Sequence, residues 1–283
     1  MNFKVSCELE YQLNNPATFL FALRCIQTGG QTIQNERLEV NPYVDVEDFH
    51  IMSGMNRFSR IRTMNSGNLS ITYQAEVDTT FRIVNLSDIP ADHASEMNPE
   101  GIPFLFPSRY CQSDVLRQQA NDLFGHLQGS YDIASGISDW IYENISYVSG
   151  SSGETSSAVD TLEQKEGVCR DFAHLGIAMC RALNVPARYA TVYAYQLDPP
   201  DFHACFEVFI GGWWYFFDPT RLAPLNGLVR IATGRDAADA AVCTIFGDPM
   251  LQKSVISCEL NDSGFVPITR DSLVTAGQAI ALL

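Results

Sequence analysis

Alternating apolar and polar residues dominate the N-terminal third of the chain. Phe3–Tyr11 and Leu69–Val77 are apolar at every second position. Phe19–Ile26 is a denser apolar run, and Thr80–Val84 is a short strand-like piece. A period of two is typical of strands that bury one face, and turn clusters rich in Asn and Gly separate these segments. We therefore predict an antiparallel β-sandwich over residues 1–92.

A proline-rich segment follows, and the periodicity then changes to that of helices. Residues 93–107 have few periodic positions, so we predict a linker there. Beyond it, apolar residues recur at helical spacing in two segments. One follows Ser113 or Asp114, either of which can cap a helix, and the other runs through Ile133. Residues 108–283 are therefore predicted to form a second, α+β domain.

A further helical pattern carries a cysteine at its start. After Gly167, apolar residues at 172, 175, 179 and 183 indicate a helix that ends near Asn184 and Pro186. Cys169 then lies at the helix N-terminus, where unpaired N–H groups and the helix dipole favour a thiolate. The dipole supplies roughly 0.3–1 kcal/mol, which is less than one pKa unit. Cys169 therefore needs a histidine partner to act as a nucleophile.

A predicted hairpin carries that histidine and a carboxylate. The residues on either side of Gly211-Gly212 alternate like two strands, and a Gly-Gly loop between such runs is a strong hairpin signal. If the residues that flank this turn pair, His203 and Asp218 are diagonal neighbours on one sheet face, ~7–8 Å apart at Cα. A one-residue slip would separate them. We predict Cys169, His203 and Asp218 as nucleophile, base and orienting acid.

Two other arrangements remain open. His174, five residues after Cys169 on the predicted helix, is a rival base, although it points about half a turn away and is better suited to packing. Cys205 shares the predicted face of His203. A metal site of these two residues and Cys169 is therefore an alternative, but its spacing is unlike structural zinc patterns. We expect no metal and no cofactor.

Four short motifs stand out in the second domain. They are GVCRDFAH (167–174), PARY (186–189), DFHA (201–204) and FDPT (217–220). At these residues the chain resembles the transglutaminase-like superfamily, in particular its bacterial cysteine-protease-like members with an N-terminal β-domain. The resemblance implies a papain-like core, in which a helix bearing the cysteine packs on an antiparallel sheet. It carries the family's catalytic residues onto Cys169, His203 and Asp218, while Arg170 and Cys205 replace a frequent glutamine and tryptophan.

The expected activity is that of a thiol enzyme acting on peptide or glutaminyl amide bonds through a thioester. Cys169 would attack the carbonyl, and its backbone N–H would form part of the oxyanion hole. Tyr147, Asn144 and Arg235 are candidates for further oxyanion or substrate contacts, although Arg235 is better suited to pairing with a neighbouring aspartate. Hydrolysis is favoured. Acyl transfer to an amine, as in crosslinking, and a non-catalytic interaction module with the same fold are the alternatives.

Composition limits the classes of binding partner and the cellular compartments that we expect for this protein. A formal net charge of −15 disfavours nucleic-acid and anionic-membrane binding, so a protein or peptide substrate is expected. No window approaches the ~18 apolar residues of a membrane span. Residues 1–20 lack the apolar run of a secretory signal. The 8 cysteines form no CxxC pair, which favours the reducing cytoplasm. Oligomeric state does not follow from these features.

Overall fold

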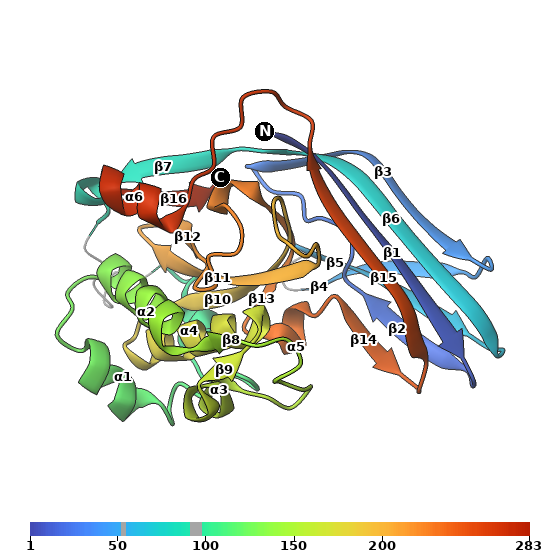
Figure 1. The fold of residues 1–283 in the computed structure, drawn as a ribbon, viewed down its shortest axis with the longest axis horizontal. Coiled ribbons are helices and arrows are strands. Elements are labelled where there is room, and N and C mark those ends of the chain that lie inside the picture. The colour runs from blue at the N-terminus through green and yellow to red at the C-terminus, as the bar shows by residue number, and fades with distance from the viewer. Residues whose placement is uncertain (52–54, 91–97) are drawn as a thin grey trace.

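The computed structural model describes residues 1–51, 55–90 and 98–283. Residues 93–97 of the predicted linker lie outside this part of the chain. Two four-stranded sheets, one six-stranded sheet and a group of helices make up the described molecule (Figure 1). Within these ranges, no helix is both long enough and apolar enough to cross a membrane.

The two four-stranded sheets form a sandwich. The strands of the first, ordered β15-β1-β6-β3, are β1 (Asn2–Leu13), β3 (Gln31–Asn41), β6 (Gly67–Thr79) and β15 (Met250–Leu260). Those of the second, ordered β14-β2-β5-β4, are β2 (Ala17–Phe21), β4 (Val46–Ile51), β5 (Asn56–Thr63) and β14 (Cys243–Phe246). Burial alternates along β1 and β6 of the first sheet and along β2 of the second, so each sheet presents an apolar face to the other. Tyr11 and Phe19 meet between the sheets, with ring centroids 5.1 Å apart. The predicted antiparallel sandwich is confirmed.

Strands cross the predicted boundary between residues 1–92 and 108–283. β15 pairs with β1, and β14 pairs with β2, so the C-terminal region completes both sheets of the sandwich. In the other direction, β7 (Phe81–Asn85) pairs with β16 (Gln278–Leu282) in the six-stranded sheet. The division into these two domains stays a prediction, but each predicted part contributes strands to the other. β16 also accounts for the apolar C-terminal tail, because most of it is buried.

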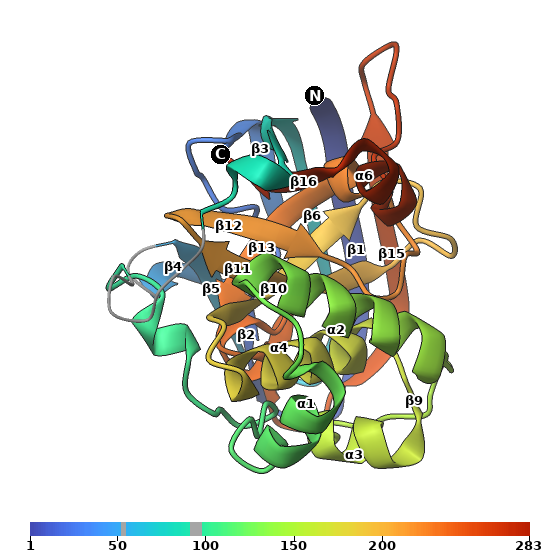
Figure 2. The same ribbon diagram turned by 90° about the vertical axis from the view of Figure 1, so that its left-hand side faces the viewer.

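The six-stranded sheet and the helices packed against it form the α+β core. Its order is β13-β10-β11-β12-β16-β7. The remaining strands are β10 (Ala187–Ala194), β11 (Phe202–Ile210), β12 (Trp213–Phe217) and β13 (Leu228–Gly234), with the short parallel pair β8 (Ser146–Tyr147) and β9 (Glu166–Gly167) outside it. The helices are α1 (Arg117–Phe124), α2 (Ser130–Asn144), α3 (Ala158–Gln164), α4 (Cys169–Ala182), α5 (Ala237–Ala240) and α6 (Arg270–Ala276). Helices α1 to α4 gather on one side of this sheet (Figure 2).

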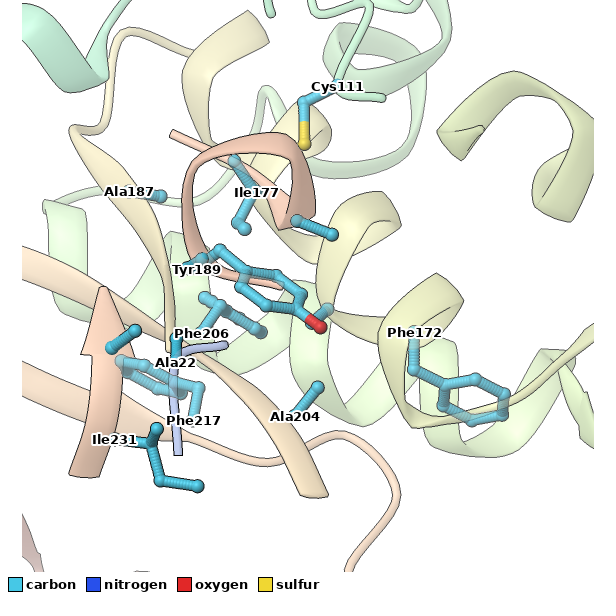
Figure 3. Close-up of a cluster of buried hydrophobic side chains, with 14 of the residues drawn as sticks. Ala22, Cys111, Phe172, Ile177, Ala187, Tyr189, Ala204, Phe206, Phe217 and Ile231 are labelled. Carbon is cyan, nitrogen blue, oxygen red and sulfur yellow. The ribbon is translucent and has the colours of Figure 1, made fainter. Parts of the chain in front are cut away.

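Helix α4 packs closely on the centre of the six-stranded sheet. A Cβ added at Gly176 would lie 2.6 Å from the Phe206 ring, so only glycine lets the helix approach β11 this closely. Figure 3 shows this layer, in which Phe206 and Tyr189 rise from the sheet toward Ile177 of the helix. These residues are fully or almost fully buried. The predicted core, with the cysteine-bearing helix on an antiparallel sheet, is therefore confirmed.

Two buried amides join the sandwich to the outer edge of β13. The Gln31 side chain accepts a hydrogen bond from the Arg230 N–H and donates one to the Arg230 carbonyl, both at 2.8 Å. Asn56 makes the same pair of bonds to the Thr233 backbone, at 2.9 and 2.7 Å. Both amides are 0% exposed. They satisfy edge groups of β13 that would otherwise be buried without partners.

An ionic cluster is buried in the same sheet. Glu207 of β11 is 0% exposed and lies between two almost fully buried arginines. Its carboxylate accepts hydrogen bonds from Arg188 Nε at 2.6 Å and from Arg230 Nε at 2.5 Å. Burial lowers the pKa of Arg188 to about 10 despite this carboxylate. Removing the single anion would leave two cations in a low-dielectric interior.

We expect Glu207→Ala to lower the free energy of unfolding by about 3–5 kcal/mol, because it leaves two buried guanidinium groups unpaired. Denaturation in guanidinium chloride, followed by tryptophan fluorescence, measures this change. Glu47→Ala is the matched control, since Glu47 also pairs with two arginines but its side chain is 52% exposed. Its expected effect is below about 1 kcal/mol. Equal losses for the two variants would contradict this account of the cluster.

Candidate active site

Cys169 begins α4, as the apolar spacing predicted. The fully buried Asp171 holds this helix end, because its carboxylate accepts hydrogen bonds from the Val168 N–H at 2.9 Å and from Ser152 Oγ at 2.5 Å. Gly167 makes room for it, since a Cβ there would lie 2.7 Å from the Asp171 Cβ. Sequence reasoning missed Asp171, although an acidic residue three positions after an N-cap is a known capping signal.

Arg170 fixes the loop beside the helix start. Its guanidinium donates to the Gly153 carbonyl at 2.6 Å, and Ser152 from the same loop binds Asp171. The glycine- and serine-rich segment before α3 is therefore tied to the N-terminus of α4 at two points. Glutamine is frequent at this position in the family that the sequence resembles. In this chain the arginine at position 170 anchors the loop instead.

The predicted hairpin register is confirmed where β11 and β12 pair. The ladder runs from Phe206 opposite Phe217 to Ile210 opposite Trp213. Beyond its end, His203 Nε2 and Asp218 Oδ2 lie 2.8 Å apart, and both side chains are 1% exposed. The structure therefore brings together the proposed base and the proposed orienting acid.

Asp218 is held in place by the residue two positions later. Its second carboxylate oxygen, Oδ1, accepts hydrogen bonds from the Thr220 N–H at 3.0 Å and from the Thr220 hydroxyl at 2.7 Å. These bonds leave Oδ2 directed at the His203 ring. Thr220 was part of a motif in the sequence but was assigned no role, and its role here is to orient the carboxylate.

The Cys169 thiol completes this arrangement. It makes a side-chain hydrogen bond with His203. Because Nε2 of His203 is engaged by Asp218, Nδ1 is the ring nitrogen left to face the thiol. Burial alone favours the neutral ring, but Asp218 and Cys169 outweigh it and raise the pKa of His203 to about 10. The geometry thus favours an imidazolium next to the sulfur at neutral pH.

Tyr147 also meets Cys169, through the bridge between β8 and β9. Residue 147 pairs with Gly167, two positions before the cysteine. The Tyr147 hydroxyl hydrogen-bonds with both the thiol and the backbone N–H of Cys169, and burial and the thiol raise the pKa of Tyr147 to about 12. Of the three candidate oxyanion or substrate residues, Tyr147 is the one at the nucleophile.

The other two candidates lie in different settings. Asn144 donates its side-chain amide to the Trp140 carbonyl at 2.8 Å, within its own helix. Arg235 forms an ion pair with Asp239, with Nε and Oδ2 2.8 Å apart, as its position near an aspartate predicted. None of the three candidates, Tyr147 included, lines the cavity beside Cys169, and no bond joins Asn144 or Arg235 to the cysteine in the described ranges. The structure therefore does not bring Asn144 or Arg235 to the candidate nucleophile.

His174 is a packing residue in this structure. Its ring is 0% exposed, stacks on Tyr110 at a centroid distance of 5.0 Å and packs at a tilt against Tyr189 at 5.1 Å. Its Nε2 accepts a hydrogen bond from the Ala237 N–H at 3.1 Å. Burial, together with nearby arginines, lowers the pKa of His174 well below the ordinary histidine value. A neutral ring in this position is not directed at Cys169.

Cys205 pairs with Ala190 of β10 and is 0% exposed. Burial raises the pKa of its thiol well above the ordinary value. It belongs to a second apolar cluster and does not line the cavity that holds Cys169. In the described ranges, no three His, Cys, Asp or Glu side chains are arranged to hold a metal ion.

A cavity of about 620 Å³ opens beside Cys169 and His203. Tyr110, Tyr189, Thr191 and Phe202 form part of its wall on the core side. Residues 242–245, which include most of β14, also line it. Sequence reasoning missed this contribution, because nothing in residues 242–245 indicates that they lie near a cysteine far earlier in the chain.

Comparison with known proteins identifies the fold. Residues 117–219 match the model of the transglutaminase-like superfamily, and residues 1–94 match that of the bacterial transglutaminase N-terminal domain. The crystal structure of a candidate cysteine protease from Cytophaga hutchinsonii is 45% identical to this chain, with a TM-score of 0.95. That match covers 100% of this chain and 98% of the other.

The chain belongs to the transglutaminase-like superfamily.

Curated relatives match over shorter segments. An uncharacterized protein of Mycobacterium leprae is 32% identical over 111 residues, which is 36% of this chain and 39% of the relative. An uncharacterized protein of Mycobacterium tuberculosis is 33% identical over 88 residues, which is 31% of this chain and 28% of the relative. The matched parts thus span well under half of these relatives. The fold and the family of thiol enzymes inferred from the four motifs are confirmed.

The pKa values of His203 and His174 should be shifted in opposite directions from the ordinary histidine value. We expect the His203 ring to remain an imidazolium at pH 8, because Asp218 and Cys169 raise its pKa to about 10. The His174 ring should stay neutral at pH 6, because burial lowers its pKa. NMR spectra of ¹⁵N-labelled imidazoles across pH 5–10 measure both.

Asp218→Asn is the informative variant in this titration. It removes the carboxylate charge that raises the pKa of His203, so that ring should lose its proton at lower pH, while His174 is unaffected. A His203 ring that is neutral at pH 7 in the unmodified protein would contradict the proposed ion pair.

Proposed function

We propose that this chain is a thiol hydrolase that cleaves amide bonds in proteins or peptides. The observation that carries the proposal is the contact between Cys169 at a helix N-terminus and a buried histidine whose other nitrogen lies 2.8 Å from the Asp218 carboxylate. A nucleophile, a base and a group that orients the base are the set that thiol catalysis requires. The cysteine-protease description of the Cytophaga hutchinsonii relative, which spans the whole chain, is consistent with it.

The proposed reaction proceeds in two steps. The Cys169 sulfur attacks the amide carbonyl, and the His203 imidazolium donates its proton to the departing amine, so that a thioester forms and the C–N bond breaks. Water then attacks the thioester while neutral His203 accepts its proton. The acid is released, and the thiolate and imidazolium are restored. Asp218 stabilises the cationic ring in both steps.

The oxyanion of each tetrahedral intermediate needs donors. The Cys169 N–H is one, by its position at the start of α4. Tyr147 is the candidate for the second, since its hydroxyl already contacts this N–H and the thiol. A substrate carbonyl entering this position would accept the Cys169 N–H in place of the tyrosine oxygen. Once the sulfur bonds to the carbonyl carbon, the phenol O–H can turn from the sulfur and donate to the same oxyanion.

Two alternatives share the fold. Acyl transfer to a primary amine uses the same residues and differs only in which nucleophile opens the thioester. A non-catalytic module would keep the fold without a reactive cysteine. We favour hydrolysis. We also propose a cytoplasmic location, with which the free state of all eight cysteines is consistent.

Alkylation by iodoacetamide tests whether Cys169 is activated. At pH 6 we expect Cys169 to react about tenfold faster than glutathione, because the His203 ring lies against the sulfur and assists its attack on the reagent. In His203→Ala this advantage should disappear. Mass spectrometry of the peptide that contains residue 169 gives the rates, and buried Cys180 is the internal control. A Cys169 that reacts no faster than glutathione in both proteins would favour the non-catalytic module.

Product analysis separates hydrolysis from transfer. A peptide library that includes glutaminyl peptides is incubated with the protein, with and without a primary amine such as putrescine. We expect cleaved peptides or free acids in both samples, and no product from Cys169→Ala. Amine adducts as the main products would instead support acyl transfer.

A further inference from the structure

β14 has a free edge. It is the outermost strand of its sheet and pairs with β2 alone among the strands of the described ranges. The Ala22 N–H donates to the Val242 carbonyl at 2.9 Å, so these two residues form a hydrogen-bonded pair just before β14 begins. In an antiparallel ladder, hydrogen-bonded and non-hydrogen-bonded pairs alternate. The N–H and C=O groups of Cys243 and Ile245 therefore point away from β2.

This edge borders the candidate active site. Val242, Thr244 and Ile245 line the same 620 Å³ cavity as Cys169 and His203. In the described part of the chain, no residue of β2 lines it. Residues 242–245 all line the cavity although their side chains alternate between the two faces of the sheet, as expected if the cavity borders the edge of β14 that β2 leaves uncovered. The outward N–H and C=O groups of Cys243 and Ile245 lie along that edge.

The lining of the cavity leaves room for a peptide. It includes four alanines, whose side chains are single methyl groups: Ala204, Ala237, Ala238 and Ala241. A strand added to a sheet lies about 4.8 Å from its neighbour and directs side chains alternately to the two faces. These small residues leave space for such side chains. Apart from His203, the acidic and basic residues of the lining are Glu154 and Arg170, and Arg170 is already paired with Asp171.

β14 is only four residues long, and it carries no lysine, proline or bulge that would block the edge. Exposed edge strands are commonly blocked by lysine, by proline or by a bulge, because unpaired backbone groups attract other chains. β14 reads Cys-Thr-Ile-Phe, its pairing with β2 has no bulge, and Ile245 and Phe246 are 37% and 59% exposed. An unblocked edge beside a reactive cysteine is suited to holding a substrate.

We propose that the substrate binds as an extended polypeptide segment that adds to the free edge of β14, through main-chain hydrogen bonds to Cys243 and Ile245. This pairing carries its amide carbonyl past Cys169. The proposal rests on the proposed function and names its substrate class: unfolded segments, loops or termini of proteins, recognised mainly by their backbone. Folded surfaces and small amides lack the extended main chain that the edge requires.

Hydrogen exchange tests the docking without catalysis. Cys169→Ala protein is mixed with reduced, carboxymethylated casein, an unfolded polypeptide, and exchange is followed by NMR. We expect the amides of Cys243 and Ile245 to become protected, because they acquire acceptors. The Thr244 and Phe246 amides, which the same alternation directs at β2, should change little. Binding without protection at 243 and 245, or no binding of casein, would overturn the proposal.

A proline substitution tests the same bonds from the protein side. Ile245→Pro removes the outward N–H but leaves the hydrogen bonds to β2 in place. Fluorescence anisotropy should show casein binding about tenfold weaker, the effect of one lost hydrogen bond. Ile245→Ala is the matched control, because it keeps the N–H while trimming the side chain. Equal affinities for the two variants, with circular dichroism showing both folded, would contradict the proposal.

Other outcomes would identify a different occupant of the edge, or would show whether the docking proposal or the proposed function is wrong. Protection at 243 and 245 that grows with protein concentration alone would mean that a second copy of the chain occupies the edge, which would overturn the proposal. Alkylation of Cys169 in the unmodified protein reports separately on the proposed function. An unreactive Cys169 with casein-dependent protection would refute the hydrolase but not the docking, whereas a reactive Cys169 without protection would refute the docking alone.

Discussion

The register of the β11–β12 hairpin is the constraint on which the rest of this structure depends. Gly211 and Gly212 both have positive φ, at 57° and 84°, and the tight turn they form pairs the strands so that His203 reaches Asp218. Glu207 lies four positions after His203 and so faces the same side of β11, where it joins two arginines. A slip of one residue would move the histidine and the buried carboxylate into the apolar layer under α4 together. The geometry of the candidate site and the stability of the core are therefore set by one turn.

The nucleophile comes from a separate scaffold. α4 reaches the sheet through the Gly176–Phe206 contact, and its N-terminus is held by Asp171 and the loop that contains Ser152. Neither element alone forms the site, because the thiol and the imidazole meet only when helix and sheet are packed. Phe172, Leu175 and Met179 of α4 belong to the same buried apolar cluster as Phe206 of β11, and this close packing fixes the helix relative to the sheet.

Much of this arrangement could be predicted from the sequence, because patterns within short segments of the chain indicate it. The start of α4 follows from apolar spacing, and the His203–Asp218 pairing follows from a two-residue glycine turn whose register allows one partner set. What could not be predicted depends on pairing between distant segments. The sequences of β14 and β15 indicate strands but do not indicate their partners. Nothing in them identifies β2 and β1, which lie more than two hundred positions earlier. The C-terminal apolar tail is likewise ambiguous until β12 and β7 are seen on either side of it. Asn144 was placed near the cysteine by closeness in sequence, but its amide bonds within its own helix.

The amides of Gln31 and Asn56 have a consequence for how this protein can be divided. They occupy the outer edge of β13, the last strand of the core sheet in the described ranges, where a further strand would otherwise be expected. A catalytic region expressed without the sandwich would expose that edge as a row of unsatisfied backbone groups next to an apolar interior. Such an edge promotes self-association. The sandwich thus covers a surface of the core that would otherwise aggregate. This gives a physical reason for the two regions to occur together in one chain.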